Sequence, residues 1–241
     1  MKKITELFTR PIAHRGLHDD RRVENSLSAF AAAIEKRLPF ELDIHLMKDG
    51  TIVVHHDDSL KRLCGVDRLL KEMTLTELKA ITFTGSNERV PTFAEVLDLT
   101  QGQVPILVEL KISNTFDPAF AEALLKLLEA YPYKDKIALQ SFNPYAVRWL
   151  KDHTDDYLVG QLSSAKLPGQ KAHVQLLFKT LLVNRISHPD FVSFDVTHLP
   201  SCFVKWARRR RPIIAWTIDD EKKRKTALEN ADQFIFERIN I

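Results

Sequence analysis

The sequence predicts an α/β fold, and more specifically a (β/α)8 TIM barrel formed by a single domain over residues 1–241. Short apolar runs, rich in β-branched and aromatic residues, alternate with longer stretches of helical periodicity, which is typical of a parallel sheet with crossover helices. Eight such runs occur, which is the number of strands in this barrel. A chain of 241 residues with 44% hydrophobic and 28% charged residues also suits one barrel domain.

Predicted strands and helices alternate along the chain. The strands are Pro11 to Gly16, Phe40 to Leu46, Ile106 to Lys111, Ile137 to Phe142, Tyr157 to Leu162, Phe191 to Val196, Pro212 to Ile218 and Gln233 to Glu237. The helices are Ser26 to Lys36, Phe93 to Thr100, Pro118 to Tyr131, Tyr145 to Asp152, one long helix within Gln170 to Arg185, Pro200 to Arg211 and Glu221 to Asn230.

Two helix starts carry recognisable capping signals. Asn25 or Ser26 is a suitable N-cap for the first helix, and Asp117-Pro118 opens the third. The last strand ends so near Ile241 that no eighth helix follows it. That flank of the barrel is therefore either open or covered by residues before Pro11.

A β-hairpin is expected directly after the second strand. Asp49-Gly50 leads into the run Thr51 to His56, a pattern typical of a two-residue type I′ loop. Counting back from such a loop sets His56 opposite Asp43. Glu41, Asp43 and His56 would then share one face of the hairpin.

An inserted segment, residues 58–91, follows the hairpin and is too long for an ordinary connection in a barrel. It contains a short predicted helix, Leu75 to Ile81, which begins with the capping-box pattern of Thr74 and Glu77. We expect this insertion to lie at the C-terminal face of the barrel and to border the site.

Three carboxylates, Glu41, Asp43 and Glu109, lie inside strand-like apolar runs. The chemistry of such barrels is located at the C-terminal strand ends, and a buried carboxylate is costly unless it is paired or bound to metal. Oxygen ligands without cysteine favour Mg²⁺ or Ca²⁺. The alternative is that the three carboxylates form salt bridges with Arg15 and Lys111, but three carboxylates at equivalent strand ends favour a site for one divalent cation.

His14 and His56 are the candidate catalytic residues, because each ends a strand beside these groups. Histidine can transfer protons near neutral pH, so one could deprotonate an attacking hydroxyl while the other protonates a leaving alkoxide. The remaining histidines are interpreted as structural.

Substrate contacts are expected from Arg15, Lys111 and Trp216. Arg15 can bind two phosphoryl oxygens at once, Lys111 can add a second positive charge, and Trp216 is either a flat apolar wall or part of the barrel core. Glu24-Asn25 is interpreted as a cap and loop anchor. Asp195 either faces the substrate or holds a loop.

Composition limits the classes of partner. A formal net charge of +3 does not indicate nucleic-acid binding, and no apolar run is long enough to span a bilayer. The segment Met1 to Leu7 lacks the apolar core of a signal peptide, and Cys64 and Cys202 are far apart in the sequence, as expected of reduced thiols. We therefore expect a cytoplasmic protein with a small-molecule substrate. The oligomeric state remains open.

In order and spacing, the sequence resembles the glycerophosphodiester phosphodiesterase family over the region from Pro11 almost to the C-terminus. The matching segments are His14-Arg15-Gly16, Glu24-Asn25, Glu41-Leu42-Asp43, Asp49-Gly50, His56-Asp57, Val90 to Leu97, Val108 to Lys111, Ser141-Phe142 and Ala215 to Ile218.

This resemblance implies a barrel enzyme that uses a metal ion to hydrolyse deacylated phospholipids to sn-glycerol 3-phosphate and an alcohol such as choline or ethanolamine. It also implies roles for single residues, and residues 58–91 correspond to the family's inserted segment. By similarity His14 and His56 match the acid/base histidines, Glu41, Asp43 and Glu109 match the metal ligands, and Arg15 and Lys111 match phosphate-binding positions.

Three departures from the family pattern concern the substrate more than the activity. The stretch Leu17 to Glu24 lacks the proline that usually precedes Glu-Asn, and Ser26 replaces the usual threonine. The stretch Asp232 to Glu237 stands where Asp-Gly-Ile-Ile-Thr-Asp is common. The leaving alcohol and the physiological cation stay open.

Two other functions are compatible with the same barrel. A phosphodiesterase resembling lysophospholipase D would be expected to show an exposed apolar rim, and the sequence shows no clear one. An inactive barrel that only binds a phosphorylated metabolite would be favoured by the loss of a histidine or a metal ligand, and all of them are present.

Overall fold

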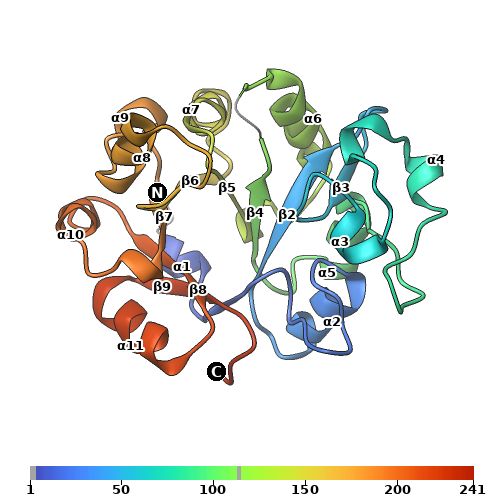
Figure 1. The fold of residues 1–241 in the computed structure, drawn as a ribbon, viewed down its shortest axis with the longest axis horizontal. Coiled ribbons are helices and arrows are strands. Elements are labelled where there is room, and N and C mark those ends of the chain that lie inside the picture. The colour runs from blue at the N-terminus through green and yellow to red at the C-terminus, as the bar shows by residue number, and fades with distance from the viewer. Residues whose placement is uncertain (1–3, 113–114) are drawn as a thin grey trace.

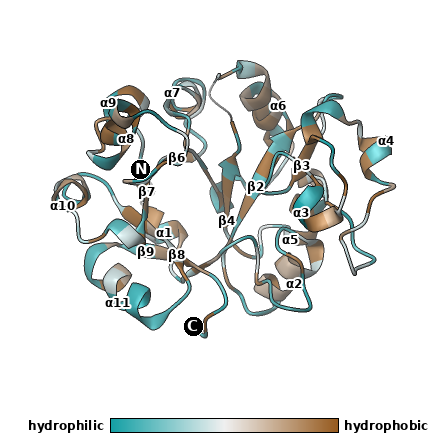
Figure 2. Ribbon diagram, viewed as in Figure 1, coloured by the Kyte–Doolittle hydropathy of each residue, from teal (hydrophilic) through white to brown (hydrophobic). Residues whose placement is uncertain are grey.

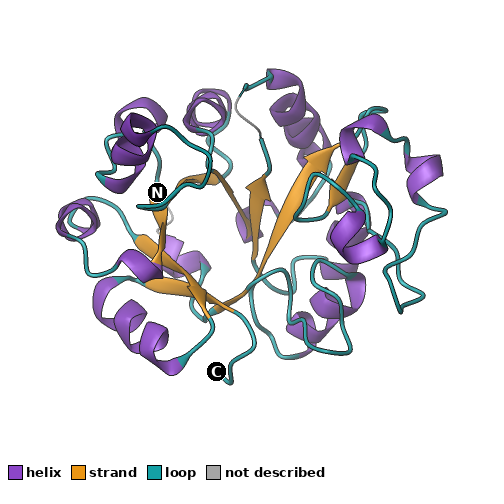
Figure 3. Ribbon diagram, in the orientation of Figure 1, coloured by secondary structure: helices purple, strands orange, loops and turns teal. Residues whose placement is uncertain are grey.

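The computed structural model describes residues 4–112 and 115–241, and its centre is a closed barrel of eight parallel strands (Figures 1 and 3). Closure follows from the pairing of the first strand with both the second and the last. The prediction of a (β/α)8 barrel is confirmed. The strands are β1 (Ile12–Ala13), β2 (Phe40–Leu46), β4 (Ile106–Leu110), β5 (Ile137–Ser141), β6 (Leu158–Ser163), β7 (Phe191–Asp195), β8 (Ile213–Ile218) and β9 (Gln233–Phe236).

Helices surround this barrel, and the exposed turns of α11 are mostly hydrophilic (Figure 2). The outer helices are α2 (Leu27–Glu35), α5 (Phe93–Thr100), α6 (Pro118–Glu129), α7 (Pro144–His153), α8 (Ala172–Lys179), α9 (Asn184–Ser187), α10 (Cys202–Arg208) and α11 (Glu221–Asn230). Two 3₁₀ turns lie in the connections: η2 (Lys134–Lys136) directly precedes β5, and η3 (Val196–His198) directly follows β7. None of the helices in the described ranges is both long and apolar enough to cross a membrane.

Local capping explains where several of these helices begin. The Ser26 hydroxyl accepts a hydrogen bond from the Ala29 amide at the start of α2, and Asp117 accepts one from Ala119 at the start of α6. The prediction of one long helix within residues 170–185 is wrong. The chain between α8 and α9 contains Leu181 at a φ of 57°, a left-handed conformation that ends an α-helix.

The N-terminal end of the barrel is closed by apolar side chains and by the helix α1 (Ile4–Leu7). Figure 1 shows α1 inside the ring of outer helices, beside β8 and β9. Of the residues before Pro11, Ile4, Leu7 and Phe8 pack under the strands. The apolar layer consists of Ile4, Phe8, Ile12, Leu107, Ala138, Phe191, Ile214 and Ile235. Gly160 makes room for the Phe191 ring, because a Cβ there would lie 2.2 Å from it.

The hairpin after β2 forms with a different register from the predicted one. Strand β3 (Ile52–Val54) pairs antiparallel to β2 with Ile44 opposite Val54, and the amide of His55 donates to the carbonyl of Asp43. The loop therefore has three residues, 48–50, and His55 instead of His56 lies opposite Asp43. Gly50 has a φ of 83°, as expected for a three-residue loop that ends in a left-handed glycine.

Residues 58–91 contain α3 (Lys61–Cys64), the 3₁₀ turn η1 (Leu70–Glu72) and α4 (Leu75–Leu78). The capping box of Thr74 and Glu77 forms both of its hydrogen bonds, and α4 ends three residues before the predicted Ile81. The apolar side chains of this segment build a small second core on the hairpin, made of Met47, Val53, Leu60, Leu70, Met73, Leu78, Phe83 and Val90.

Candidate active site

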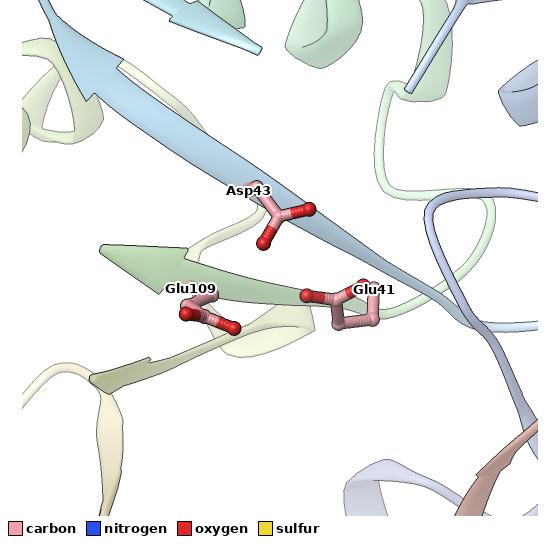
Figure 4. A group of neighbouring side chains, drawn as sticks. All are labelled: Glu41, Asp43 and Glu109. Atoms are coloured by element: carbon pink, nitrogen blue, oxygen red, sulfur yellow. The ribbon is translucent and has the colours of Figure 1, made fainter. Parts of the chain in front are cut away.

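Three carboxylates meet at the C-terminal end of the barrel (Figure 4). Glu41 and Asp43 lie two residues apart on β2 and therefore share a face, and Asp43 is in register with Glu109 of β4. One oxygen of each carboxylate lies within 4.8 Å of the others, and all three side chains are buried. We call Glu41, Asp43 and Glu109 the carboxylate triad. Its composition is that of a site for a hard cation.

Two cationic side chains contact the triad. The Lys111 Nζ lies 2.9 Å from Glu109 Oε1 and 3.4 Å from Asp43 Oδ1, and the Arg15 Nε lies 3.4 Å from Asp43 Oδ2. The salt bridges considered as an alternative therefore exist together with the cluster. Arg15 is shared, because its Nη1 donates to Glu24 Oε1 at 2.7 Å.

The triad carries more negative charge than these two cations neutralise. Burial raises the pKa of Glu41 well above its ordinary value, and repulsion from Asp43 and Glu109 raises it further. Burial also raises the pKa of Glu109, against the attraction of Lys111. Burial acts in the same direction on Asp43, but the charges of Lys111 and Arg15 hold the pKa of Asp43 well below its usual range. A bound divalent cation would relieve this repulsion.

The turn after β1 holds the triad from one side. Arg15 and Gly16 have φ values of 51° and 80°, and the Arg15 amide donates to Glu41 Oε2 at 3.1 Å. A Cβ on Gly16 would lie 2.9 Å from the backbone of Ala29, so α2 packs closely on this turn. Asn25 donates through Nδ2 to Asp43 Oδ2 at 2.9 Å, which makes it the loop anchor that the sequence indicated.

His14 follows β1 and is held by a carboxylate from the opposite end of the chain. Its Nδ1 donates to Glu237 Oε2 at 2.6 Å, and its Nε2 lies 4.0 Å from Glu41 Oε2. Glu237 also lies 3.5 Å from His18. Sequence reasoning missed Glu237, although it directly follows β9 and so lies at a C-terminal strand end like the other site residues.

His56 is anchored in the same way, by the carboxylate of the residue that follows it. Its Nδ1 donates to Asp57 Oδ1 at 2.7 Å. Burial lowers the pKa of His56, the attraction of Asp43 raises it, and the charges of Lys111 and Arg15 lower it further. His56 therefore lies in the field of the triad although the predicted hairpin register is wrong. The strand ends at Val54, and beyond it side chains need not alternate between faces.

Comparison with known proteins agrees with this geometry. The profile of the glycerophosphoryl diester phosphodiesterase family matches residues 14–238. The chain belongs to this family. A glycerophosphodiester phosphodiesterase from Caldanaerobacter subterraneus subsp. tengcongensis is 34% identical over 223 residues, which are 88% of this chain and 86% of that protein. Family membership makes the chain an enzyme, a phosphoric diester hydrolase, as the resemblance implied.

Two further relatives of this chain are a lysophospholipase D and a phosphodiesterase solved with a bound product. A human lysophospholipase D is 29% identical over 126 residues, which are 47% of this chain and 40% of that protein. A phosphodiesterase from Oleispira antarctica, solved in complex with the product sn-glycerol-3-phosphate, has the same fold with a TM-score of 0.79 at 21% identity, over 98% of this chain and 95% of that one.

Two predicted positions remain, Trp216 and Asp195, and their surroundings differ. Trp216 on β8 is partly exposed and meets Phe142 edge to face at 5.8 Å between ring centroids. Its Nε1 is buried and finds no acceptor among the described residues. Asp195 holds loops, since it accepts hydrogen bonds from Thr197 and Ser164.

Proposed function

We propose that this enzyme hydrolyses glycerophosphodiesters, the deacylated phospholipids, to sn-glycerol 3-phosphate and an alcohol, with one divalent cation, Mg²⁺ or Ca²⁺, at Glu41, Asp43 and Glu109. One observation carries the proposal. Two histidines border the carboxylate triad, since His14 lies 4.0 Å from Glu41 and the charge of Asp43 acts on His56, and each has its Nδ1 fixed by a carboxylate. This arrangement leaves both Nε2 atoms for proton transfer.

The residues around the triad suit a phosphodiester. The cation would supply charge neutralisation and polarisation of the phosphoryl group. Arg15 is fixed by Glu24 and Asp43, so its guanidinium is preorganised to bind phosphoryl oxygens. Lys111 supplies a second positive charge from the side of β4. The partly exposed ring of Trp216, which meets Phe142 edge to face, would supply an apolar wall for the substrate.

Proton transfer is assigned to His14 and His56. One removes the proton of the attacking hydroxyl, and the other protonates the oxygen of the leaving alcohol. The carboxylates of Glu237 and Asp57 orient the rings and stabilise each imidazolium when it forms. A cytoplasmic location is part of the same proposal and is supported by the two free cysteines, Cys64 and Cys202.

A coupled assay for released glycerol 3-phosphate, over a panel of glycerophosphodiesters, tests the activity and identifies the preferred alcohol. His14→Ala and His56→Ala are each expected to lower kcat on glycerophosphocholine by about 10²-fold or more, because each removes a general acid or base. A p-nitrophenyl diester, whose leaving group needs no proton, should partly rescue whichever histidine is the acid. Near-normal turnover of the natural diester by both variants would exclude this pair.

A lysophospholipase D reaction is a second candidate, and one observation favours it. An apolar groove of about 450 Å³ lies beside the site. It reaches Ile112, which directly follows Lys111, and Phe142, which contacts Trp216, and it extends along Leu177 and Phe178 of α8. Such a groove can hold an acyl chain. Lysophosphatidylcholine in the same panel separates the two substrates.

A further inference from the structure

The insertion sends one side chain back to the active site. Arg62 of α3 donates through Nη1 and Nη2 to both oxygens of Glu24, at 2.9 and 2.7 Å. Its Nε donates to Asp57 Oδ2 at 2.6 Å. One guanidinium thus joins two carboxylates that belong to separate loops.

Each of these carboxylates holds a residue that the proposed function requires. Glu24 accepts from Arg15 at 2.7 Å, on the phosphate-binding side. Asp57 accepts from the Nδ1 of His56 at 2.7 Å, on the proton-transfer side. A continuous chain of charge-assisted hydrogen bonds therefore runs from Arg15 through Glu24, Arg62 and Asp57 to His56.

The fold holds α3 firmly enough for this role. Leu60, just before the helix, is buried in the small core of the insertion, and Leu63 and Cys64 pack against that core. Gly65 ends the helix at a φ of 70°, and the Leu63 carbonyl accepts from the Thr84 amide at 2.8 Å. The backbone of α3 is therefore fixed by the insertion, while Arg62 points away from its core toward the loops of the barrel.

We propose that Arg62 is a positioning residue. It orients His56 through Asp57 and Arg15 through Glu24, and this inference rests on the proposed function. An arginine is required because its planar fork offers Nε and both Nη groups at once to two carboxylates. A lysine at the same position has one ammonium group and cannot reproduce both contacts. The insertion would then complete the active site in addition to bordering it.

If Arg62 had a purely structural role, its replacement would affect the protein as little as the replacement of another exposed arginine in the insertion. The Arg62 side chain is 46% exposed, and ion pairs at such exposed positions contribute little to folding stability. Arg68 provides a matched control in the same insertion. Its side chain is 44% exposed and forms an ion pair at 2.9 Å with Glu77, which belongs to the capping box of α4 instead of the site.

The experiment compares Arg62→Gln, Arg62→Lys and Arg68→Gln by kcat, KM and Tm on the preferred glycerophosphodiester. Arg62→Gln is expected to lower kcat/KM by about 10- to 10²-fold, because a small misplacement of a catalytic group has effects of this size. Its Tm should stay within about 2 °C of that of Arg68→Gln. Arg62→Lys should fall between Arg62→Gln and wild type, and Arg68→Gln should match wild type.

A double-mutant cycle with Asp57→Asn then tests the route. If part of the effect of Arg62 passes through Asp57, the double variant should lose clearly less activity than the product of the two single losses. Multiplying losses, wild-type activity of Arg62→Lys, or equal activity of Arg62→Gln and Arg68→Gln would each overturn the inference. His56→Ala, measured in the same assay, separates the two proposals: high activity of that variant contradicts the proposed function itself.

Discussion

At the scale of single residues, the decisive feature is the imbalance of charge in the carboxylate triad. In the described part of the chain, no lysine or arginine side chain forms an ion pair with Glu41: its Oε2 accepts from the Arg15 amide and lies 4.0 Å from His14 Nε2. Lys111 and Arg15 are directed at Asp43 and Glu109, and Arg15 also neutralises Glu24. Glu41 is therefore the carboxylate whose negative charge is least neutralised by neighbouring cations, and we expect it to contribute most to the binding of a divalent cation.

We predict that chelation abolishes the activity and that added Mg²⁺ or Ca²⁺ restores it. Glu41→Gln should lower kcat/KM by about 10²-fold, the scale of losing one electrostatic stabiliser. It should also reduce the increase in Tm that the cation produces in the wild type, since a ligand that binds only the folded state raises Tm. Glu122→Gln, at an exposed position of α6, serves as the control and should keep both properties. Full turnover after complete removal of metal would contradict the assignment.

Residue patterns could predict the triad and both histidines as candidates, because charged residues inside apolar strand-like runs are rare enough to stand out. The same reasoning could not find Glu237 or Arg62. Glu237 gains its meaning only when the closed barrel brings the last strand beside the first, which places it 2.6 Å from His14. Arg62 lies on a four-residue helix with no periodic signal, and its partners come from two other loops.

At the scale of elements, α1 has a role that its length does not suggest. The helix has four residues, yet Ile4 and the following Phe8 are both buried in the layer that fills the N-terminal end of the barrel. The Phe8 carbonyl also accepts a hydrogen bond from Gln233 of β9 at 2.9 Å. These contacts make α1 the closing element of the barrel, far from the catalytic end.

We predict that Phe8→Ala destabilises the protein without impairing the chemistry. Removing a fully buried phenylalanine costs about 3–5 kcal/mol, which corresponds to a fall in Tm on the order of 10 °C for a chain of this size. Phe203→Ala on α10, where the ring is 40% exposed, is the matched control and should change Tm little. Thermal unfolding and kcat at 25 °C measure the two effects. Equal Tm values for the two variants would show that α1 does not close the barrel.

Elements were predictable to different degrees, for physical reasons. The strand Phe40 to Leu46 and the helices Phe93 to Thr100 and Glu221 to Asn230 have the predicted bounds, because strong periodicity and capping residues mark them. The hairpin register was predicted one residue off. Asp49-Gly50 suits a two-residue loop and a three-residue loop equally, and the pairing of Met47 with Thr51 decides for the second.

At the scale of the whole molecule, barrel closure assembles a site from residues that span most of the chain, from His14 to Glu237. Polar groups at the ends of parallel strands meet at one rim because all these strands run in the same direction. This topology could be predicted from the alternation of strands and helices. Contacts across the rim depend on side-chain placement, and they follow only from the structure.

The pH dependence of stability should reveal histidines that are buried in the neutral form. His55 is fully buried, its Nδ1 donates to the Asp57 carbonyl at 2.8 Å, and its Nε2 has no partner in the described part of the chain. Burial lowers the pKa of His55, and burial lowers the pKa of His45 to about 4. The unfolded chain therefore binds more protons than the folded one below about pH 6.5, and the free energy of unfolding falls as the pH falls through this range.

Two other sets of titratable groups also change the pH dependence of stability. The pKa values of Glu41 and Glu109 are raised, so their protonation favours the folded state as the pH falls and acts in the opposite direction. The pKa values of Glu24 and Asp57 are lowered to about 2. The stability that these two ionised carboxylates contribute is therefore lost only in more acidic solution. A comparison of variants between pH 7.5 and 5 isolates the histidine, because both other sets remain the same in each variant.

We predict that His55→Asn unfolds in urea with a weaker pH dependence than wild type. The asparagine amide lies near the position of Nδ1 and keeps a donor for the Asp57 carbonyl, but it cannot titrate. Between pH 6.5 and 5 the wild type should lose up to about 2 kcal/mol relative to the variant, since each unit of pH below the unfolded pKa contributes about 1.4 kcal/mol. His173→Asn changes an exposed ring on α8 and should follow the wild-type curve. If the stability of His55→Asn depends on pH as that of the wild type does, protonation of the buried His55 ring does not destabilise the folded state. The proposed origin of the acid sensitivity is then wrong.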